Sequence, residues 1–136
     1  EAWERYRLPL AVTEAHNGCT REEQLRWLHE IWSAALGLRR DGADVRAVTL
    51  WSMFGAVDWC SLLTRREGRA EPGMFDFTRR RPRPTLVAKA AVALAGRGKF
   101  SHPALAAPGW WRRPDRFHHK PVRPARLPGR PILITG

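Results

Sequence analysis

The chain has 136 residues, of which 43% are hydrophobic, and this suffices for one ordinary domain. Its formal net charge of +11 is unevenly distributed: residues 1–78 carry ten Arg and twelve Asp or Glu, whereas residues 79–130 carry fourteen Lys or Arg and one acid, Asp115. A uniformly basic nucleic-acid-binding domain would not divide in this way. The sequence has no run of 18 apolar residues, so we expect no membrane span.

Two strands joined by a helix are predicted in the first half. Residues 8–13, Leu-Pro-Leu-Ala-Val-Thr, form an apolar run typical of a strand buried in a parallel sheet. Thr20 and Glu23 match a capping box, in which Thr20 caps the helix and Glu23 reaches back. Apolar residues then recur at helical spacing and predict a helix over about 20–40. Residues 45–51 form a second apolar run, and this order predicts a parallel strand pair.

The second half is predicted to be less regular. Residues 60–73 are polar and contain Gly, which indicates a loop, and residues 74–77 form a short extended piece. Pro84 is a suitable first residue for a helix over 86–94. Six Pro recur between residues 99 and 130 among Arg, His and Trp. That composition resists helix and sheet, so we expect an irregular connector that packs little.

Acidic and aromatic residues follow the two predicted strands. Glu14 ends the first strand, and ligands of parallel α/β sheets bind at the carboxyl ends of strands. Its carboxylate is therefore a candidate site residue, with a cap on the next helix as the alternative. After the second strand, Trp51 and Trp59 flank Asp58. Aromatic faces stack on the C–H faces of sugars, and carboxylates accept hydrogen bonds from sugar hydroxyls, although a Trp can also serve only to fill a core.

Together these segments resemble glycoside hydrolase family 1 and its relatives in the same barrel clan. The nucleophile segment of that family reads Thr-Glu-Asn-Gly, and residues 13–18 read Thr-Glu-Ala-His-Asn-Gly. A family strand end reads Trp-Ser-x-x-Asp-Asn-x-Glu-Trp, and residues 51–59 have the same length and the same Trp-Ser start and Trp end. Residues 75–77 and 83–84 correspond to an extended Val-Asp-Phe and to the start of the last helix. The resemblance covers roughly residues 6–95.

The resemblance implies an α/β fold in which residues 1–98 form the C-terminal portion, the last two βα units, of a (β/α)₈ TIM barrel. An irregular Pro/Arg-rich connector, residues 99–130, then follows. The implied activity is that of a retaining, β-glucosidase-like O-glycosyl hydrolase, which needs a second carboxyl about 5–5.5 Å from its nucleophile. In the family that carboxyl stands on an earlier strand, and a whole barrel takes about 250 residues. We therefore expect the chain alone to be inactive.

The resemblance also assigns roles to single residues. Glu14 takes the position of the catalytic nucleophile. Trp51 takes that of the platform beneath the sugar in the cleavage subsite. Asp58 stands where the family has a Glu that holds sugar hydroxyls, and Trp59 matches a second Trp near those hydroxyls.

Three positions depart from the family pattern. Gly55 and Ala56 replace an Asp and an Asn, which removes two polar groups that fix the loop. His16 has no counterpart in the family, and it either lines the cleft as a substrate-binding residue or faces solvent. The departures at Gly55, Ala56 and Asp58 leave open an alternative function, a non-catalytic sugar-binding barrel that serves a neighbouring reductase domain.

Residues 131–136 carry a second resemblance. They read Pro-Ile-Leu-Ile-Thr-Gly, and with Arg130 they look like the opening of a dTDP-4-dehydrorhamnose reductase or a related sugar-nucleotide oxidoreductase. This implies the first strand of a Rossmann-like domain, for which the cofactor would be NAD(P). No cofactor is expected for the barrel part. The implied whole is a hydrolase-like barrel fused through a connector to a sugar-nucleotide reductase.

Other sites and partners have weaker support in the sequence. Cys19, Cys60, His16 and Asp58 match no zinc signature, so no metal site is predicted. The basic stretch lacks a basic helix, so we expect a carbohydrate partner and no specific nucleic acid, and nothing indicates an oligomeric state. Two cysteines favour free thiols in a reducing compartment. With no initiating Met and no leader-like start, a segment of a longer cytoplasmic, bacterial protein is the expectation.

Overall fold

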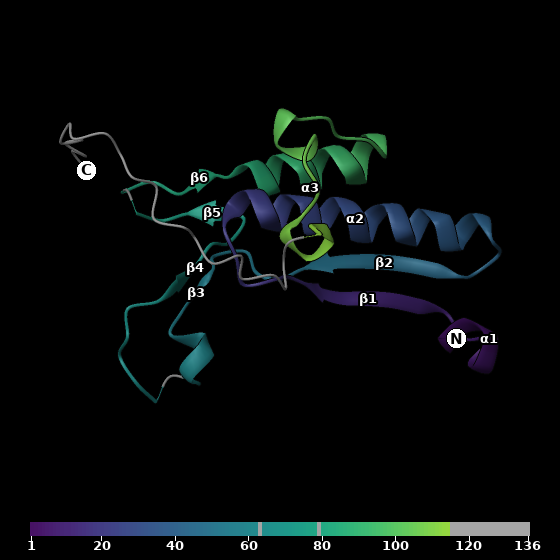
Figure 1. Ribbon diagram of the computed structural model, residues 1–136, viewed down its shortest axis with the longest axis horizontal. Helices are drawn as coiled ribbons and strands as arrows, with labels where there is room; N and C mark the ends of the chain where they lie inside the picture. Colours follow the sequence, from purple (N-terminus) through teal and green to yellow (C-terminus); the bar gives the residue numbers. More distant parts are fainter. Residues whose placement is uncertain (63, 79, 115–136) are drawn as a thin grey trace.

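The structure is a computed structural model that describes residues 1–62, 64–78 and 80–114. At its centre β1 (Leu10–Ala15) and β2 (Val45–Leu50) pair in parallel, and α2 (Arg21–Arg40) connects them (Figure 1). The strand–helix–strand unit predicted from the sequence is thereby confirmed. A short helix, α1 (Ala2–Tyr6), precedes β1. The described residues contain three two-stranded sheets, and a closed barrel is not among them.

The long helix α2 begins and ends at the signals found in the sequence. Thr20 is its N-cap, and the Thr20 hydroxyl accepts a hydrogen bond from the backbone N–H of Glu23 at 3.4 Å. The expectation that the Glu23 side chain returns to Thr20 is wrong, because its carboxylate binds Arg26 and Arg113 instead. The helix closes at Asp41, and Gly42 follows with a φ of 89°, a conformation that glycine adopts without steric cost.

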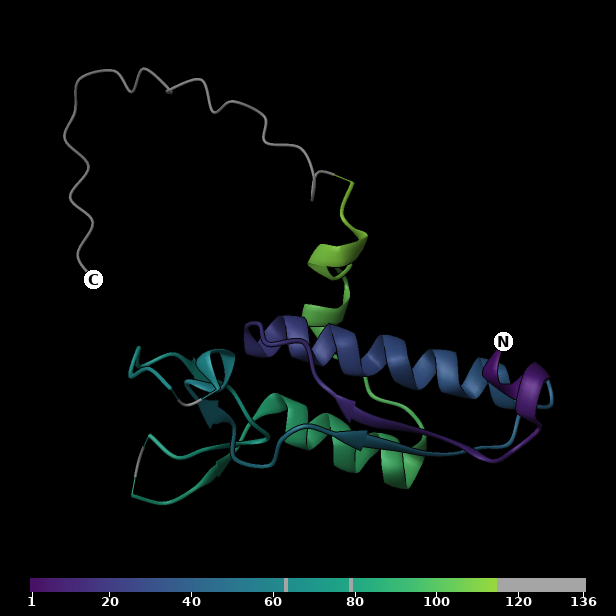
Figure 2. The same ribbon diagram turned by 90° about the horizontal axis from the view of Figure 1, so that it is seen from below.

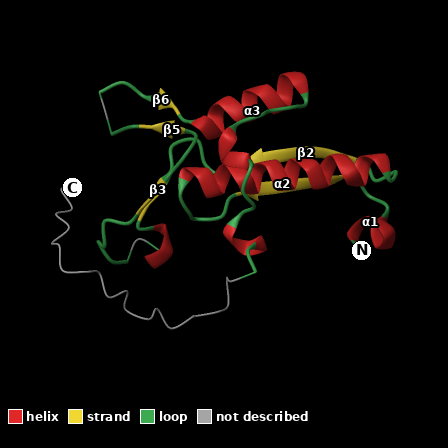
Figure 3. Ribbon diagram, turned by 45° about the horizontal axis from the view of Figure 1, so that its top comes forward, coloured by secondary structure: helices red, strands yellow, loops and turns green. Residues whose placement is uncertain are grey.

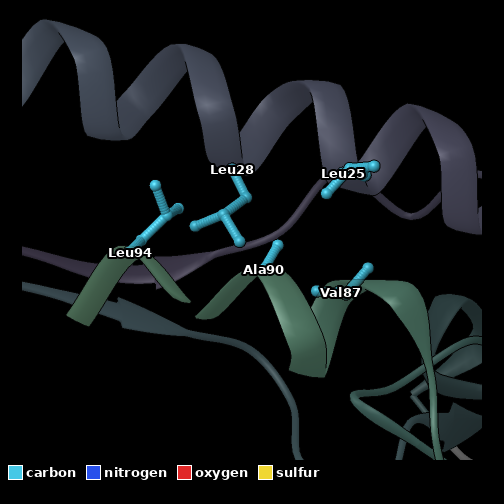
Figure 4. Close-up of a cluster of buried hydrophobic side chains, with 5 residues drawn as sticks. All are labelled: Leu25, Leu28, Val87, Ala90 and Leu94. Carbon is cyan, nitrogen blue, oxygen red and sulfur yellow. The ribbon is translucent and has the colours of Figure 1, made fainter. Parts of the chain in front are cut away.

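The main hydrophobic core lies between α2 and α3 (Leu86–Arg97). Leu25 and Leu28 of α2 point toward three apolar residues of α3, Val87, Ala90 and Leu94 (Figure 4). Leu25 is fully buried, and complete burial of one such side chain stabilises a fold by about 1.5–3 kcal/mol. The helix α3 is longer than the sequence predicted. It begins after Thr85, while Pro84 belongs to a strand and not to the first turn.

Two small hairpins lie beyond the carboxyl ends of the parallel strands. The first pairs β3 (Ala56–Val57) with β4 (Ala70–Glu71), and the second pairs β5 (Phe75–Asp76) with β6 (Arg83–Pro84), both antiparallel. In Figure 1 they stand past the arrowheads of β1 and β2. The loop expected over residues 60–73 thus contains β4. Hairpins in this position can shape a site at the strand ends.

The parallel pair is covered on one face. In Figure 1 both α2 and α3 stand above β1 and β2, and in the view from below the two strands overlap α3 and run alongside α2 (Figure 2). On the strands, small side chains are exposed: Ala11, Thr13, Ala47 and Thr49. Within the described ranges, β1 and β2 have only each other as ladder partners, so their outer edges are free.

The segment after α3 packs across α2. Two short 3₁₀ turns, η2 (Pro103–Leu105) and η3 (Trp110–Arg112), lie against that helix (Figures 1 and 3). The expectation that the connector packs little is wrong for residues 100–114. Phe100 and Leu105 reach the hydrophobic core, and polar contacts to α2 add to them. A Pro-rich segment without regular structure can be ordered when side chains of its neighbour satisfy its backbone and its charges.

No helix in the described part of the chain is long and apolar enough to span a membrane. Residues 131–136 lie outside the described residues, so the predicted first strand of an NAD(P)-binding domain stays a prediction. The same holds for the connector from residue 115 onward.

Candidate functional site

The end of β1 is distorted at Glu14. Between the pairs Val12–Val48 and Ala15–Leu50, β1 has two residues where β2 has one, which makes a β-bulge. Glu14 adopts a left-handed backbone conformation with a φ of 57°. Few residues other than glycine do so, and bulges next to active sites serve to re-aim a side chain. Such backbone outliers cluster at functional sites.

Glu14 and Trp51 lie at the same end of the strand pair. The backbone N–H of Glu14 donates to the Thr49 hydroxyl at 3.3 Å, which ties the bulge to the end of β2. Trp51 directly follows the last residue of β2. Glu14 is exposed, so its carboxylate is open to solvent. The structure therefore brings together the two residues that the sequence placed at one site, and their chemical roles stay predictions.

Trp51 and Trp59 form an aromatic pair above the strand ends. Their ring centroids are 5.8 Å apart and the ring planes are inclined by 41°. Trp51 is half-buried, whereas Trp59 is 48% exposed. The peptide bond between Trp51 and Ser52 is cis. An exposed ring next to a half-buried one offers an apolar surface on which the C–H face of a sugar ring can stack.

His16 joins three segments of the site. Its Nδ1 donates to the Trp51 carbonyl oxygen at 2.9 Å, and its Nε2 lies 2.8 Å from Oε2 of Glu71 in β4. A carbonyl oxygen can only accept, so the proton on Nδ1 is fixed by geometry. Both side chains are mostly buried. Of the two alternatives for His16, the structure favours a place within the site, where it acts first as a link.

Glu71 is a site residue that sequence reasoning missed. It brings a second carboxylate to the strand ends through the β3–β4 hairpin. That hairpin is only two residue pairs long, which leaves no periodic pattern for sequence analysis to detect. Two glycines allow the hairpin to close. A Cβ on Gly55 would lie 2.2 Å from the Glu71 carbonyl oxygen, and one on Gly73 would lie 2.1 Å from the Gly55 nitrogen.

Asp58 holds its own loop together. Its Oδ1 accepts from the backbone N–H of Arg69 at 2.9 Å, and its Oδ2 accepts from that of Glu67 at 3.2 Å. The residue is 8% exposed and has a φ of 55°. Both carboxylate oxygens are therefore engaged by the backbone. The predicted role of Asp58 in binding sugar hydroxyls stays a prediction, while its observed contacts are structural.

A charged pair anchors the second hairpin to the start of α2. Asp76 accepts from the backbone N–H and the hydroxyl of Thr78, at 2.9 and 2.8 Å, and from Arg21 at 3.0 Å. These hydrogen bonds, those from Thr78 first, lower the pKa of Asp76 from 3.8 to about 2. Its carboxylate therefore stays ionised throughout the neutral range.

Three buried polar atoms near the strand ends lack partners among the described residues. They are the amide oxygen and nitrogen of Asn17 and the hydroxyl of Ser52. Asn17 follows β1 and Ser52 follows β2, so both belong to the same end of the pair. Buried polar groups in folded proteins are nearly always hydrogen-bonded, and leaving one unpaired costs about 1–3 kcal/mol.

The described residues hold no group of three or more His, Cys, Asp or Glu side chains placed to bind a metal ion. Cys19 is half-buried and Cys60 is exposed, and both are free thiols. No protein-family model matches the chain, and neither the curated proteins nor the solved structures give a match. The proposals that follow therefore stand on the geometry of the site and on the resemblance of its motifs.

Proposed function

We propose that this chain supplies the last two βα units of a glycosidase-like (β/α)₈ barrel, with Glu14 as the nucleophile of a retaining O-glycosyl hydrolase. The observation that carries the proposal is the placement of Glu14. An exposed carboxylate stands on a bulge, in a backbone conformation rare for its type, at the same end of a parallel pair as two tryptophan faces. Carboxylates and aromatic rings are the groups that glycoside chemistry requires at such a strand end.

The architecture supports the barrel part of the proposal. Successive helices of a (β/α)₈ barrel lie outside its ring of strands, and here α2 and α3 lie on one face of β1 and β2. The small exposed residues of the opposite face would then point into the barrel. One half of a doubly wound sheet shares this arrangement, so the choice between the two rests on Glu14 and Trp51. The buried polar atoms of Asn17 and Ser52 have no hydrogen-bond partner among the described residues. This supports the proposal that groups outside the described residues cover the carboxyl ends of β1 and β2.

In the proposed reaction Glu14 attacks the anomeric carbon of a sugar that stacks on Trp51 and Trp59. A second carboxyl, from a strand outside the described residues, protonates the leaving oxygen. A covalent glycosyl ester forms on Glu14, and water then hydrolyses it with retention of configuration. His16 fixes the Trp51 backbone through its carbonyl and so positions the stacking surface.

A second candidate function is a sugar-binding barrel without catalysis, fused to a sugar-nucleotide reductase. The contacts of Asp58 favour it, since that carboxylate is engaged by the backbone and not open to a ligand. The close approach at Gly55 favours it as well, because the polar residue of the hydrolase pattern would not fit there. Stacking on Trp51 and Trp59 would be the same in both cases.

The hydrolase and the non-catalytic barrel are distinguished by measuring cleavage of aryl glycosides. The protein to use is the longest natural one that carries residues 1–136. Glu14→Gln keeps the shape of the side chain but removes the nucleophile, so cleavage of aryl glycosides should be lost. Azide should restore cleavage of an activated aryl glycoside by entering the vacated space. Glu4→Gln, on α1 before β1, is the matched control and should keep full activity.

If the wild-type protein cleaves and Glu14→Gln matches it, Glu14 is not the nucleophile. If the wild-type protein binds sugars but cleaves none of them, the non-catalytic barrel is the better account. If it neither binds nor cleaves any sugar, both proposals fail.

A further inference from the structure

A hollow separate from the Trp51–Trp59 pair lies between the β3–β4 hairpin and β5. It has a volume of about 420 Å³. Phe54 and Phe77 stand on its wall with their rings edge to face, 4.8 Å between centroids and 88° between planes. They are 63% and 46% exposed. Two large apolar rings that face solvent in a concave site are typical of a ligand-binding surface.

The polar groups around this hollow narrow the chemistry of that ligand. Arg21 and Asp76 line it as an ion pair, and hydrogen bonds from Thr78 and Arg21 keep the pKa of Asp76 low, so that its carboxylate is ionised at neutral pH. Glu71 and the hydroxyl-bearing Thr78 line it as well. The hollow thus combines aromatic faces, carboxylate acceptors and a guanidinium donor. A pyranose ring presents the matching set, because it has an apolar C–H face and a rim of hydroxyls that both donate and accept.

The hollow is connected to the first site by covalent and hydrogen bonds. Phe54 follows Trp51 by three residues, and Glu71 lines the hollow while it binds His16. His16 in turn donates to the Trp51 carbonyl oxygen. Because three residues span at most about 11 Å of extended chain, Phe54 and Trp51 lie close enough together for one saccharide of two or more rings to reach both.

We propose that this hollow is a second sugar subsite, which holds the ring next to the one at Trp51 and Trp59. The preferred ligand is accordingly a disaccharide or a longer saccharide. Phe54 and Phe77 supply the stacking surface, and Glu71, whose Oε2 binds His16, accepts hydrogen bonds from hydroxyls at its Oε1. This inference rests on the proposed sugar-binding function and adds the length of the ligand to it.

The test compares matched mono- and disaccharides by isothermal titration calorimetry on the longest natural protein that carries residues 1–136, with Glu14→Gln in place so that no probe is cleaved. The probes are methyl β-glucoside with methyl β-cellobioside, methyl α-glucoside with methyl α-maltoside, and 4-nitrophenyl β-glucoside. For at least one pair the disaccharide should bind about tenfold more tightly than the monosaccharide, the size of effect that a few aromatic and polar contacts supply.

Phe54→Ala and Phe77→Ala should each reduce that gain severalfold, and the double variant should remove it. Monosaccharide binding should stay unchanged, and both side chains are exposed enough for the fold to tolerate their loss. Val92→Ala, an exposed apolar position on α3, is the matched control and should keep the full gain.

Equal affinity for mono- and disaccharide, or a gain that survives in the double variant, would overturn the second subsite while leaving the proposed function intact. Tight binding of the 4-nitrophenyl glycoside alone, lost in Phe77→Ala, would reassign the hollow to an aromatic aglycone. Binding of none of the probes would overturn both the subsite and the sugar-binding function on which it rests.

Discussion

The molecule contains two tryptophan pairs in different surroundings. Trp27 of α2 and Trp111 of η3 meet edge to face, with ring centroids 5.0 Å apart. The Trp111 indole N–H donates to Glu30 at 2.8 Å, and Arg112 binds the same carboxylate. The pair of Trp51 and Trp59 stands at the strand ends, with one ring largely open to solvent. The two pairs share a residue type and differ in their surroundings, since Trp111 is bound to Glu30 while Trp59 is 48% exposed.

The first pair belongs to a polar strap, residues 100–114, that closes over the outer side of α2. Glu23 and Glu30 face it from the helix. Glu23 binds Arg113 and the Trp110 backbone N–H, and Glu30 binds Arg112. The other side of α2 is apolar and packs on α3. We expect the packing of α2 on α3, to which Phe100 and Leu105 add, to carry most of the stability. The ion pairs of the strap should add less, because pairs that are at least partly exposed contribute about 0–1 kcal/mol each.

The largest loss of stability is expected from a substitution on the side of α2 that packs on α3. Leu28→Ala removes a buried side chain between α2 and α3, and it should lower the free energy of unfolding by about 2–5 kcal/mol. Leu38→Ala on the same helix removes an exposed side chain and should change it by less than about 0.5 kcal/mol. Urea denaturation followed by circular dichroism measures both. Equal effects of the two substitutions would mean that the helix pair does not form the core.

The two tryptophan pairs should respond differently to truncation. Trp111→Ala removes the ring contact with Trp27 and the hydrogen bond to Glu30, and it should cost about 1–2 kcal/mol of stability. Trp59→Ala removes a ring that is 48% exposed and pairs with Trp51, and it should cost less stability than Trp111→Ala, about 0.5–1 kcal/mol, while abolishing sugar binding. Thermal unfolding measures the stability of both variants, and calorimetric titration measures their sugar binding. Loss of sugar binding in Trp111→Ala alone would reverse the assignment of the two pairs.

At Glu14 the side chain that the proposed function needs should reduce stability, whereas the residues of the strap carry no such cost. Its left-handed backbone costs roughly 1–2 kcal/mol for a residue with a Cβ. Glycine avoids that cost but is more flexible when unfolded, so Glu14→Gly should be more stable than Glu14→Ala by about 0.5–1 kcal/mol. Both should lack the function of the carboxylate. Chemical denaturation that finds Glu14→Ala the more stable would show that the bulge is not left-handed.

The smallest expected effect is the pH dependence of the stability that the Glu30–Arg112 ion pair of the strap contributes. Hydrogen bonding to Arg112 is the largest cause that lowers the pKa of Glu30 below its ordinary 4.5. A lowered pKa means that the stabilisation is complete above about pH 4.5 and is lost as the pH falls through the lowered value. The stability difference between the wild-type chain and Glu30→Gln, a few tenths of a kcal/mol, should therefore shrink between about pH 6 and about pH 3. A difference that grows on acidification would contradict the ion pair.

The strand–helix–strand unit was predictable because each of its signals is local. Leu25 and Leu28 recur at helical spacing, and Thr20 supplies a cap five residues before Leu25. The strap was not predictable, because its contacts join residues 82 positions apart, as between Arg112 and Glu30. Charged pairs of that kind leave no periodic trace in a sequence. Counting apolar residues therefore underestimated how well the segment packs.

The candidate site was predictable in its position and less so in its details. Parallel pairing brought Glu14 and Trp51 to one end, as the order of elements required. The left-handed backbone of Glu14 has no sequence signature, since it is imposed by the bulge. Asp58 turned toward its own loop because two backbone N–H groups lie within reach. Glu71 lies in the β3–β4 hairpin, which is too short to show a periodic pattern of apolar residues in the sequence.

The most direct test of the account follows the indole N–H signals of the seven Trp by NMR during titration with a sugar. Single Trp→Phe variants assign the signals of Trp51, Trp59, Trp27 and Trp111, and the probes are the methyl glycosides and disaccharides used for calorimetry. The account predicts saturable shifts at Trp51 and Trp59, none at Trp27 and Trp111, and loss of the shifts in Trp59→Ala. Saturable shifts confined to Trp27 and Trp111, or no shift with any of these sugars, would contradict a carbohydrate site at the carboxyl ends of β1 and β2.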